Sequence, residues 1–256
     1  MSEKKTGVNN NEFIKQFAFL SCLFAAAAVF LGYGISVIVG PPDTDASAEA
    51  PVNSGTIVVI DAGHGGEDGG AVAADGTLEK DLNLQFSKTL HSVCGLLGID
   101  SVLTRDTDVL LYDKYSDLED YTGKKKVYDL KNRLRFANED GEDVIFVGIH
   151  MNKFPDTKYS GTQIYYSPNS AESMTLAQGM QSKVKELLQP DNNREIKKAG
   201  SSIFLLKRLK VPAILAECGF LSNAEETQKL KSDDYKKEFS LTAAAAIGEF
   251  INTRNS

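Results

Sequence analysis

The chain has 256 residues, of which 42% are hydrophobic and 25% are charged, a composition typical of a globular protein with one sizeable core. Its formal net charge of −7 argues against a general nucleic-acid-binding protein, because attraction to phosphate needs an excess of lysine and arginine. The cysteines Cys22, Cys94 and Cys218 have no spacing typical of a zinc knuckle or a redox pair.

The chain begins with a predicted membrane or signal segment. Residues 1–16 are polar and contain lysines, whereas residues 17–39 are uncharged and mostly apolar. A helix of that length is roughly 34 Å long, against about 30 Å for the hydrocarbon core of a bilayer. Because lysines precede this segment and acidic residues follow it, we expect 1–16 in the cytoplasm and the rest of the chain outside. An uncleaved anchor is favoured over a cleaved signal, and 40–55 has a linker's composition.

The folded domain is predicted to open with a buried strand that ends in a glycine-rich loop. Residues 57–60 are all β-branched, which is typical of a strand covered on both faces in a parallel sheet. The loop that follows carries His64 among several glycines. The carboxyl ends of parallel strands are where open α/β sheets bind their ligands, so His64 is a candidate site residue.

The remaining elements alternate between helices and strands. A helix over 77–97, with Thr77 as N-cap and Glu79 in its first turn, leads to a short strand over 99–104 that closes a βαβ unit. The patterns then predict a charged loop over 106–126, strands over 143–150, 161–166 (an edge strand), 203–206 and 212–217, and helices over 130–138, 171–188 and 238–251. This order predicts one α/β domain over 56–256, with a mostly parallel sheet of about six strands flanked by helices on both faces.

Metal-binding or proton-transferring side chains occur at the ends of several predicted elements. His64, His150 and Glu217 lie at the carboxyl ends of strands, and Glu79 begins the helix that starts at the same edge of the sheet. Glu79 alone would also suit the positive end of a helix dipole. Two histidines and one carboxylate, with one position left for water, are typical of a catalytic zinc site. A further carboxylate beside it, Glu217, would serve as the base in amide hydrolysis.

Several motifs occur in the order found in a known enzyme family. The segments IDAGHGGEDGG, LEKDLNL, LTRDTD, NRLRFAN, IHMN and PAILAECGFLSNAEE resemble the bacterial zinc-dependent N-acetylmuramoyl-L-alanine amidases over residues 56–251. The resemblance implies a single α/β domain that hydrolyses the bond between muramic acid and L-alanine in peptidoglycan. It places His64, Glu79 and His150 on the Zn²⁺ ligands and Glu217 on the catalytic glutamate.

Within the family, the chain resembles the germination-specific type, with an apolar N-terminal segment, one domain and no wall-binding repeats. That resemblance implies trimming of spore cortex peptidoglycan so that muramic δ-lactam forms, outside the cytoplasm, for example in the forespore intermembrane space. Gly148, Met151 and Cys218 depart from the family's pattern around the ligands. We therefore hypothesise that the isolated domain holds zinc weakly and that an exported activator protein docks near the lysine-rich insert.

Two alternative functions fit the same residues. A zinc peptidase that cuts within the stem peptide would use the same groups on another amide bond. A non-catalytic wall-binding or scaffolding protein would carry the same side chains as a vestigial site.

Overall fold

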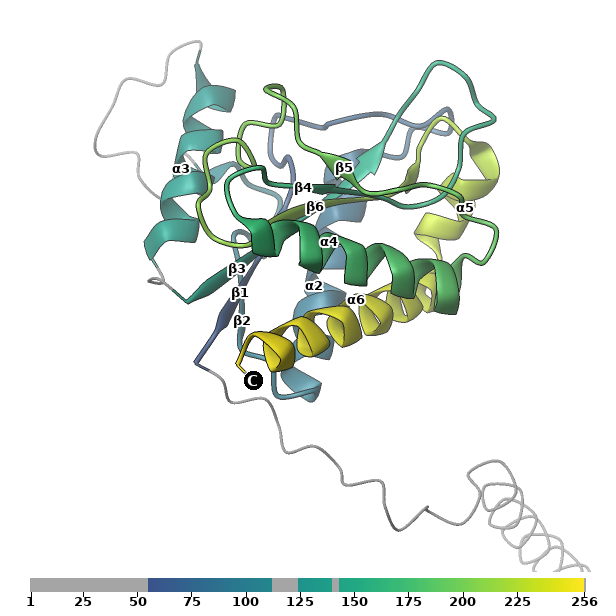
Figure 1. Ribbon diagram of the computed structural model, residues 1–256. Helices are drawn as coiled ribbons and strands as arrows, with labels where there is room; N and C mark the ends of the chain where they lie inside the picture. Colours follow the sequence, from purple (N-terminus) through teal and green to yellow (C-terminus); the bar gives the residue numbers. More distant parts are fainter. Residues whose placement is uncertain (1–54, 112–123, 140–142, 256) are drawn as a thin grey trace, which may run out of the picture. The chain divides into compact units, whose positions relative to one another are not determined.

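The computed structural model describes residues 55–111, 124–139 and 143–255 (Figure 1). No helix within these residues is both long and apolar enough to cross a membrane. The predicted segments 1–16 and 17–39 lie outside the described residues, as do nearly all of the linker 40–55 and the middle of the insert 106–126.

A six-stranded sheet forms the centre of the domain, in the order β2-β1-β3-β6-β4-β5. Every neighbouring pair is parallel except β4 and β6, so the prediction of a mostly parallel, six-stranded sheet is confirmed. The strands are β1 (Ile57–Ala62), β2 (Ser101–Leu103), β3 (Val144–Asn152), β4 (Gln163–Tyr166), β5 (Lys197–Lys198) and β6 (Ala213–Phe220).

Both faces of the sheet are covered. The helices are α2 (Glu79–Leu96), α3 (Lys125–Glu139), α4 (Ala171–Lys183), which continues as one π-helical turn over Val184–Leu188, α5 (Ala224–Lys231) and α6 (Asp233–Arg254). On one face, Ile60 and Ile145 pack in a core with residues of α2, α4 and α6, of which α4 and α6 lie side by side (Figure 1). On the other face, Val59 and Phe146 pack with residues of α3 and of 199–211. Successive strand residues point to opposite faces, which explains how β1 and β3 contribute to both cores.

Two predictions for the strands are wrong. Residues 203–206 form a turn, not a strand, and their apolar side chains Leu205 and Leu206 are buried in the core beside α3. A short apolar run can be buried without any strand pairing, so periodicity does not distinguish the two cases. The sixth strand is instead β5, and because β4 pairs with both β5 and β6, β4 is not an edge strand.

The predicted helix boundaries also differ from the structure. Thr77 is not the N-cap of α2, because its amide donates to Asp75 Oδ1 at 3.0 Å in a local turn, and Leu78 occupies the cap position without a side-chain cap. The helix predicted over 130–138 begins earlier, at Lys125, so Lys125 and Lys126 of the insert lie at the start of α3. The closing helix is longer than predicted and is preceded by α5, whose N-cap Asn223 accepts hydrogen bonds from Glu225 and Glu226.

Candidate metal centre

His64 lies two residues past the end of β1, with a backbone φ of +62° that is unusual for a residue other than glycine. Position 63, directly before it, must be a glycine for a steric reason. A Cβ on Gly63 would lie 2.2 Å from atoms of the His150 ring, so only glycine lets the β1 loop pass this close to β3. The glycine-rich loop therefore brings two imidazoles together, with ring centroids 5.1 Å apart.

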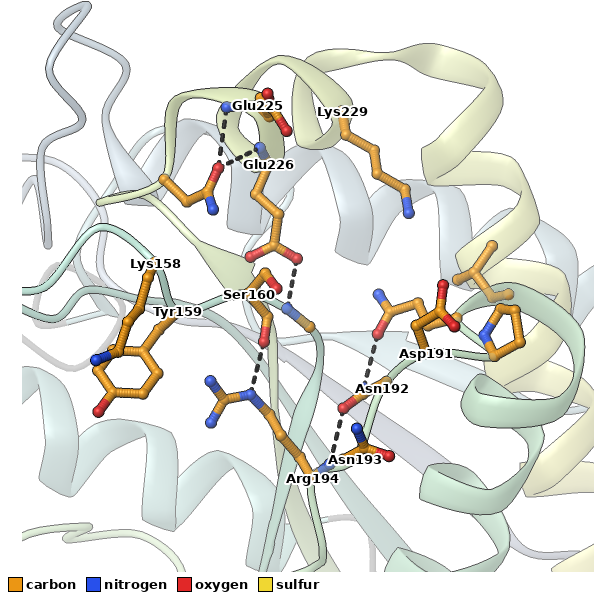
Figure 2. A pocket seen from close by; sticks show the side chains of 15 residues that line it. Lys158, Tyr159, Ser160, Asp191, Asn192, Asn193, Arg194, Glu225, Glu226 and Lys229 are labelled. Carbon is orange, nitrogen blue, oxygen red and sulfur yellow. Dashed lines mark hydrogen bonds between the residues drawn. The ribbon is translucent and has the colours of Figure 1, made fainter.

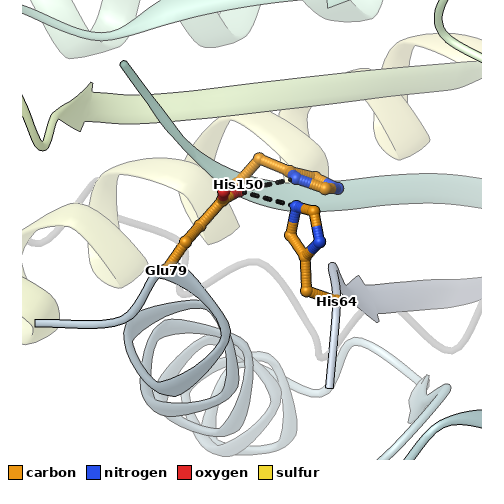
Figure 3. A group of neighbouring side chains, drawn as sticks. All are labelled: His64, Glu79 and His150. Atoms are coloured by element: carbon orange, nitrogen blue, oxygen red, sulfur yellow. Dashed lines mark hydrogen bonds and ion pairs between the residues drawn. The ribbon is translucent and has the colours of Figure 1, made fainter. Parts of the chain in front are cut away.

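Glu79 in the first turn of α2 joins these two histidines (Figure 3). Its Oε1 lies 3.2 Å from His64 Nε2 and 2.9 Å from His150 Nδ1, and it also accepts a hydrogen bond from the Met151 amide at 3.2 Å. Its Oε2 accepts from the Ala71 amide at 2.8 Å. The side chain is nearly buried, at 4% exposure for the residue, so these contacts fix the carboxylate in one place.

The electrostatics of the cluster keep Glu79 ionised. Burial by itself disfavours the charged carboxylate, but hydrogen bonds from His150 and His64 hold the pKa of Glu79 far below its usual range. Burial likewise opposes a charge on His64, but Glu79 and Asp68 together raise the pKa of His64. The Asp68 carboxylate lies 2.9 Å from His64 Nδ1, so it orients the ring with Nε2 toward Glu79.

The donor set of His64, Glu79 and His150 fits a zinc ion. One ligand atom from each residue lies within 4.8 Å of the other two. In a tetrahedral zinc site with bonds of about 2.0–2.1 Å, ligand atoms are about 3.3 Å apart, so small side-chain adjustments suffice. Imidazole and carboxylate groups are ordinary zinc donors, and three protein ligands leave a fourth position open.

Glu217 stands beside this cluster on β6. It is the register partner of His150 on the neighbouring parallel strand, so the two side chains leave the same face of the sheet. Burial raises the pKa of Glu217 to about 7, and its buried Oε2 has no hydrogen-bond partner within the part of the chain that the structure describes. A carboxyl group with this pKa and a free oxygen is suited to accept and return a proton near neutral pH.

A buried arginine that the sequence reasoning missed supports the His64 loop. Arg133 on α3 donates to the carbonyl oxygens of Ala62 at 2.7 Å and His64 at 2.5 Å. Its guanidinium also pairs with the buried carboxylates of Asp61 and Asp129, at 2.6 and 2.8 Å. The sequence signal was an arginine within the apolar stripe of the predicted helix, in the motif NRLRFAN.

Arg105 holds the same loop from the other side. It follows β2 and donates from Nε to the Ala62 carbonyl at 2.9 Å and from Nη2 to the Gly63 carbonyl at 3.0 Å. Asn83 on α2 donates to the Gly63 carbonyl as well, at 3.0 Å. The backbone of the loop before His64 is therefore fixed by side chains from α2, from α3 and from the segment after β2.

Comparisons with known proteins find relatives that belong to one family. A family model described as N-acetylmuramoyl-L-alanine amidase matches residues 58–249. The germination-specific N-acetylmuramoyl-L-alanine amidase of Bacillus subtilis is 32% identical over 183 residues, which cover 72% of this chain and 74% of that protein. The CwlD amidase from Clostridioides difficile, solved in complex with the GerS lipoprotein, is 34% identical with a TM-score of 0.71 and covers 77% of this chain and 99% of that chain. The N-acetylmuramoyl-L-alanine amidase AmiC2 of Nostoc punctiforme is 27% identical with a TM-score of 0.64, and the match covers 77% of this chain and 98% of that chain.

Proposed function

Since the chain belongs to the N-acetylmuramoyl-L-alanine amidase family, whose members hydrolyse the amide between muramic acid and L-alanine in peptidoglycan, we propose that it does so as a zinc enzyme. His64, Glu79 and His150 would hold the Zn²⁺ ion, and Glu217 would transfer the proton. The observation that carries this proposal is the convergence of three zinc-type ligand atoms within 4.8 Å, beside the Glu217 carboxyl group, whose buried Oε2 has no partner among the described residues.

The chemistry assigned to each group follows from its surroundings. Zinc, when bound, supplies a Lewis acid that polarises the lactyl carbonyl and makes a water molecule more acidic. Glu217 accepts a proton from the attacking water as the new C–O bond forms at the lactyl carbon. It then delivers that proton to the nitrogen of L-alanine as the C–N bond breaks. The products are a free lactyl carboxylate on the glycan and a peptide that begins with L-alanine.

The finer biological role rests on the relatives. A Bacillus subtilis relative is named germination-specific, and the Clostridioides difficile CwlD structure has the highest TM-score of the structures given above. We propose that this chain trims spore cortex peptidoglycan, so that muramic δ-lactam forms. Its place of action would be outside the cytoplasm, with residues 17–39 as the membrane anchor or signal segment.

A protein partner that stabilises the metal site is the second part of the proposal. CwlD was solved together with the lipoprotein GerS, which supports an exported partner for this chain too. The start of α3 offers a physical route from a partner to the metal centre. Lys126 Nζ lies 3.1 Å from Asp68 Oδ2, and the same oxygen contacts His64 Nδ1. A protein that docks on the lysine-rich start of α3 would therefore restrain His64 and raise zinc affinity.

The reaction is tested by mass spectrometry of peptidoglycan fragments after incubation with the full chain, with and without added zinc. Zinc-dependent release of peptides that begin with L-alanine, together with free lactyl groups on the glycan, supports the proposal. New termini within the stem peptide would identify a peptidase instead. Bound but uncut peptidoglycan at full zinc occupancy would identify a wall-binding protein. Full zinc occupancy of the chain alone, after dialysis, would contradict the need for a partner.

A further inference from the structure

A second hollow lies beyond the carboxyl end of β6 (Figure 2). It has a volume of about 720 Å³ and is open to solvent. Its walls are the turn at 158–161, the segment 188–194 that follows the π-helical turn, and the start of α5. No residue of the proposed metal centre lines it.

Arg194 is a basic residue of this hollow whose guanidinium is held by neighbouring groups. Its Nε donates to the Ser160 carbonyl at 2.7 Å, and its guanidinium carbon lies 4.4 Å from the centroid of the Phe220 ring and 5.7 Å from that of Tyr159. An arginine fixed by stacking and by Nε keeps both terminal nitrogens available for a planar acceptor such as a carboxylate. Figure 2 shows the guanidinium directed toward Tyr159.

The acidic groups nearby leave Arg194 available for a ligand. The Glu226 carboxylate accepts hydrogen bonds from the amides of Gly161 and Phe220, at 2.6 and 2.7 Å. Glu195, the next residue in the chain, pairs with Lys185 at 2.7 Å. Asp191 and Glu225 line other parts of the hollow and are exposed. Among the described residues, no carboxylate lies within ion-pair distance of Arg194, although its charge acts on the Glu226 carboxylate from farther away and partly offsets the effect of burial on the Glu226 pKa.

The hollow borders the edge of the sheet where Glu217 lies. Gln163 on β4 is the register partner of Glu217, and its side chain donates to the carbonyl of Glu195. Adjacent strands are about 4.8 Å apart, so the segment with Arg194 packs within two strand spacings of Glu217. Phe220, under the guanidinium, is three residues beyond Glu217 on β6, which is about 10 Å along a strand.

We propose that Arg194 binds the carboxylate of the third residue of the stem peptide while the amide to L-alanine lies at Glu217. This inference rests on the proposed function, because it names how that substrate is held. An extended peptide advances about 3.3–3.6 Å per residue, so the carboxylate of a tripeptide lies about 10 Å from its first amide. The Tyr159 ring and the stacked guanidinium would form the floor on which the peptide lies.

The test compares two muramoyl tripeptides that differ only at the last residue, which ends in a carboxylate in one and in a carboxamide in the other. With the zinc-loaded full chain, we expect KM to be about tenfold lower for the acid, since a charge-assisted bidentate contact is worth at least that factor. Arg194→Ala should raise KM for the acid about tenfold and leave kcat unchanged. It should raise KM for the carboxamide much less, so that the preference for the acid is lost. Arg194→Lys should give an intermediate KM for the acid.

Arg208→Ala is the matched control. Arg208 also stacks on an aromatic ring, with its guanidinium carbon 3.7 Å from the Phe204 centroid, but it does not line the hollow. This variant should keep the preference for the acid. An equal loss for both substrates in Arg194→Ala would show a structural role only and overturn the inference, as would equal KM values in the wild type. If the wild type cleaves neither substrate, the proposed function itself fails and the inference fails with it.

Discussion

Arg133 Nη2 donates a hydrogen bond to the backbone carbonyl of His64 at 2.5 Å, although the two residues are 69 positions apart. Holding a non-glycine residue in the left-handed region costs about 1–3 kcal/mol, so a conformation like that of His64 persists only when its surroundings fix it. The buried guanidinium and its partner Asp61, at 2.6 Å, supply that restraint from α3 and β1. The position of one proposed zinc ligand therefore depends on a buried ion pair.

Arg133→Lys tests this dependence. Lysine keeps the positive charge beside Asp61 but cannot make the forked contact to the carbonyls of Ala62 and His64. We expect a stable fold with zinc affinity at least tenfold weaker, measured by zinc titration and denaturant unfolding. Arg133→Met, which leaves two buried carboxylates unpaired, should lose about 3–5 kcal/mol of stability. The exposed Lys131→Ala on the same helix is the control, and unchanged zinc affinity in Arg133→Lys would contradict the role.

The same ion pair predicts a pH dependence of stability. Burial disfavours the charged form of Asp61, but Arg133 and the Thr104 hydroxyl more than compensate, so the pKa of Asp61 is lowered. A lowered pKa contributes stability above the unfolded value of about 3.9, and that contribution is lost as the pH falls through the folded pKa. The Tm of the wild type should therefore fall more steeply between about pH 5 and pH 3 than that of Asp61→Asn. Asp234→Asn, at an exposed position, should keep the wild-type slope.

The three histidines of the chain provide a direct test of metal binding. His64→Ala should lose both zinc and activity, because one of three ligand atoms is removed. His91→Ala should keep both, since His91 contacts Ser101 at 2.8 Å and does not belong to the cluster. Measurements of zinc content and turnover on the two variants test this prediction. Normal zinc content in His64→Ala would contradict the ligand assignment.

Glu217→Gln should separate proton transfer from metal binding. The amide has nearly the shape of the carboxyl group but cannot accept a proton from water. Turnover should fall by about a hundredfold or more, while zinc content and the unfolding midpoint stay close to wild type. Glu238→Gln, an exposed glutamate on α6, controls for the change of charge. Wild-type turnover in Glu217→Gln would favour a non-catalytic role for this residue.

Gly63→Ala tests the close approach of the His64 loop to β3. The new Cβ would lie 2.2 Å from the His150 ring, so the imidazole or the loop must move. We expect loss of zinc affinity and of most activity in a protein that still folds. Gly179→Ala on α4 meets no atom within 4 Å and should be neutral or stabilise by up to about 1 kcal/mol. Activity and zinc titration on both variants check this, and normal zinc binding by Gly63→Ala would contradict the steric argument.

The local patterns in the sequence explain why the main elements were predictable. The continuous β-branched run at 57–60 indicates a strand that is buried on both faces. The spacing of the apolar residues in α2 indicates which face of that helix is buried. The strand predictions are wrong where the burial of a segment does not show whether it pairs with another strand. The turn at 203–206 is as apolar as a strand, and β5 is only two exposed lysines long. The cap of α2 was missed because Asp75 binds the Thr77 amide, a competing local turn.

The fold class and the candidates His64, Glu79, His150 and Glu217 could be predicted from the amino-acid sequence, because element ends are local features and family motifs occur in a fixed order. Their roles as zinc ligands and catalytic base stay predictions. How these side chains meet, and which residues hold them, became visible in the folded domain alone. The contacts from Arg105 and Arg133 to the His64 loop span 42 to 71 positions, and contacts between such distant residues leave no periodic signal. They exist because a parallel sheet brings the ends of separate strands to one edge.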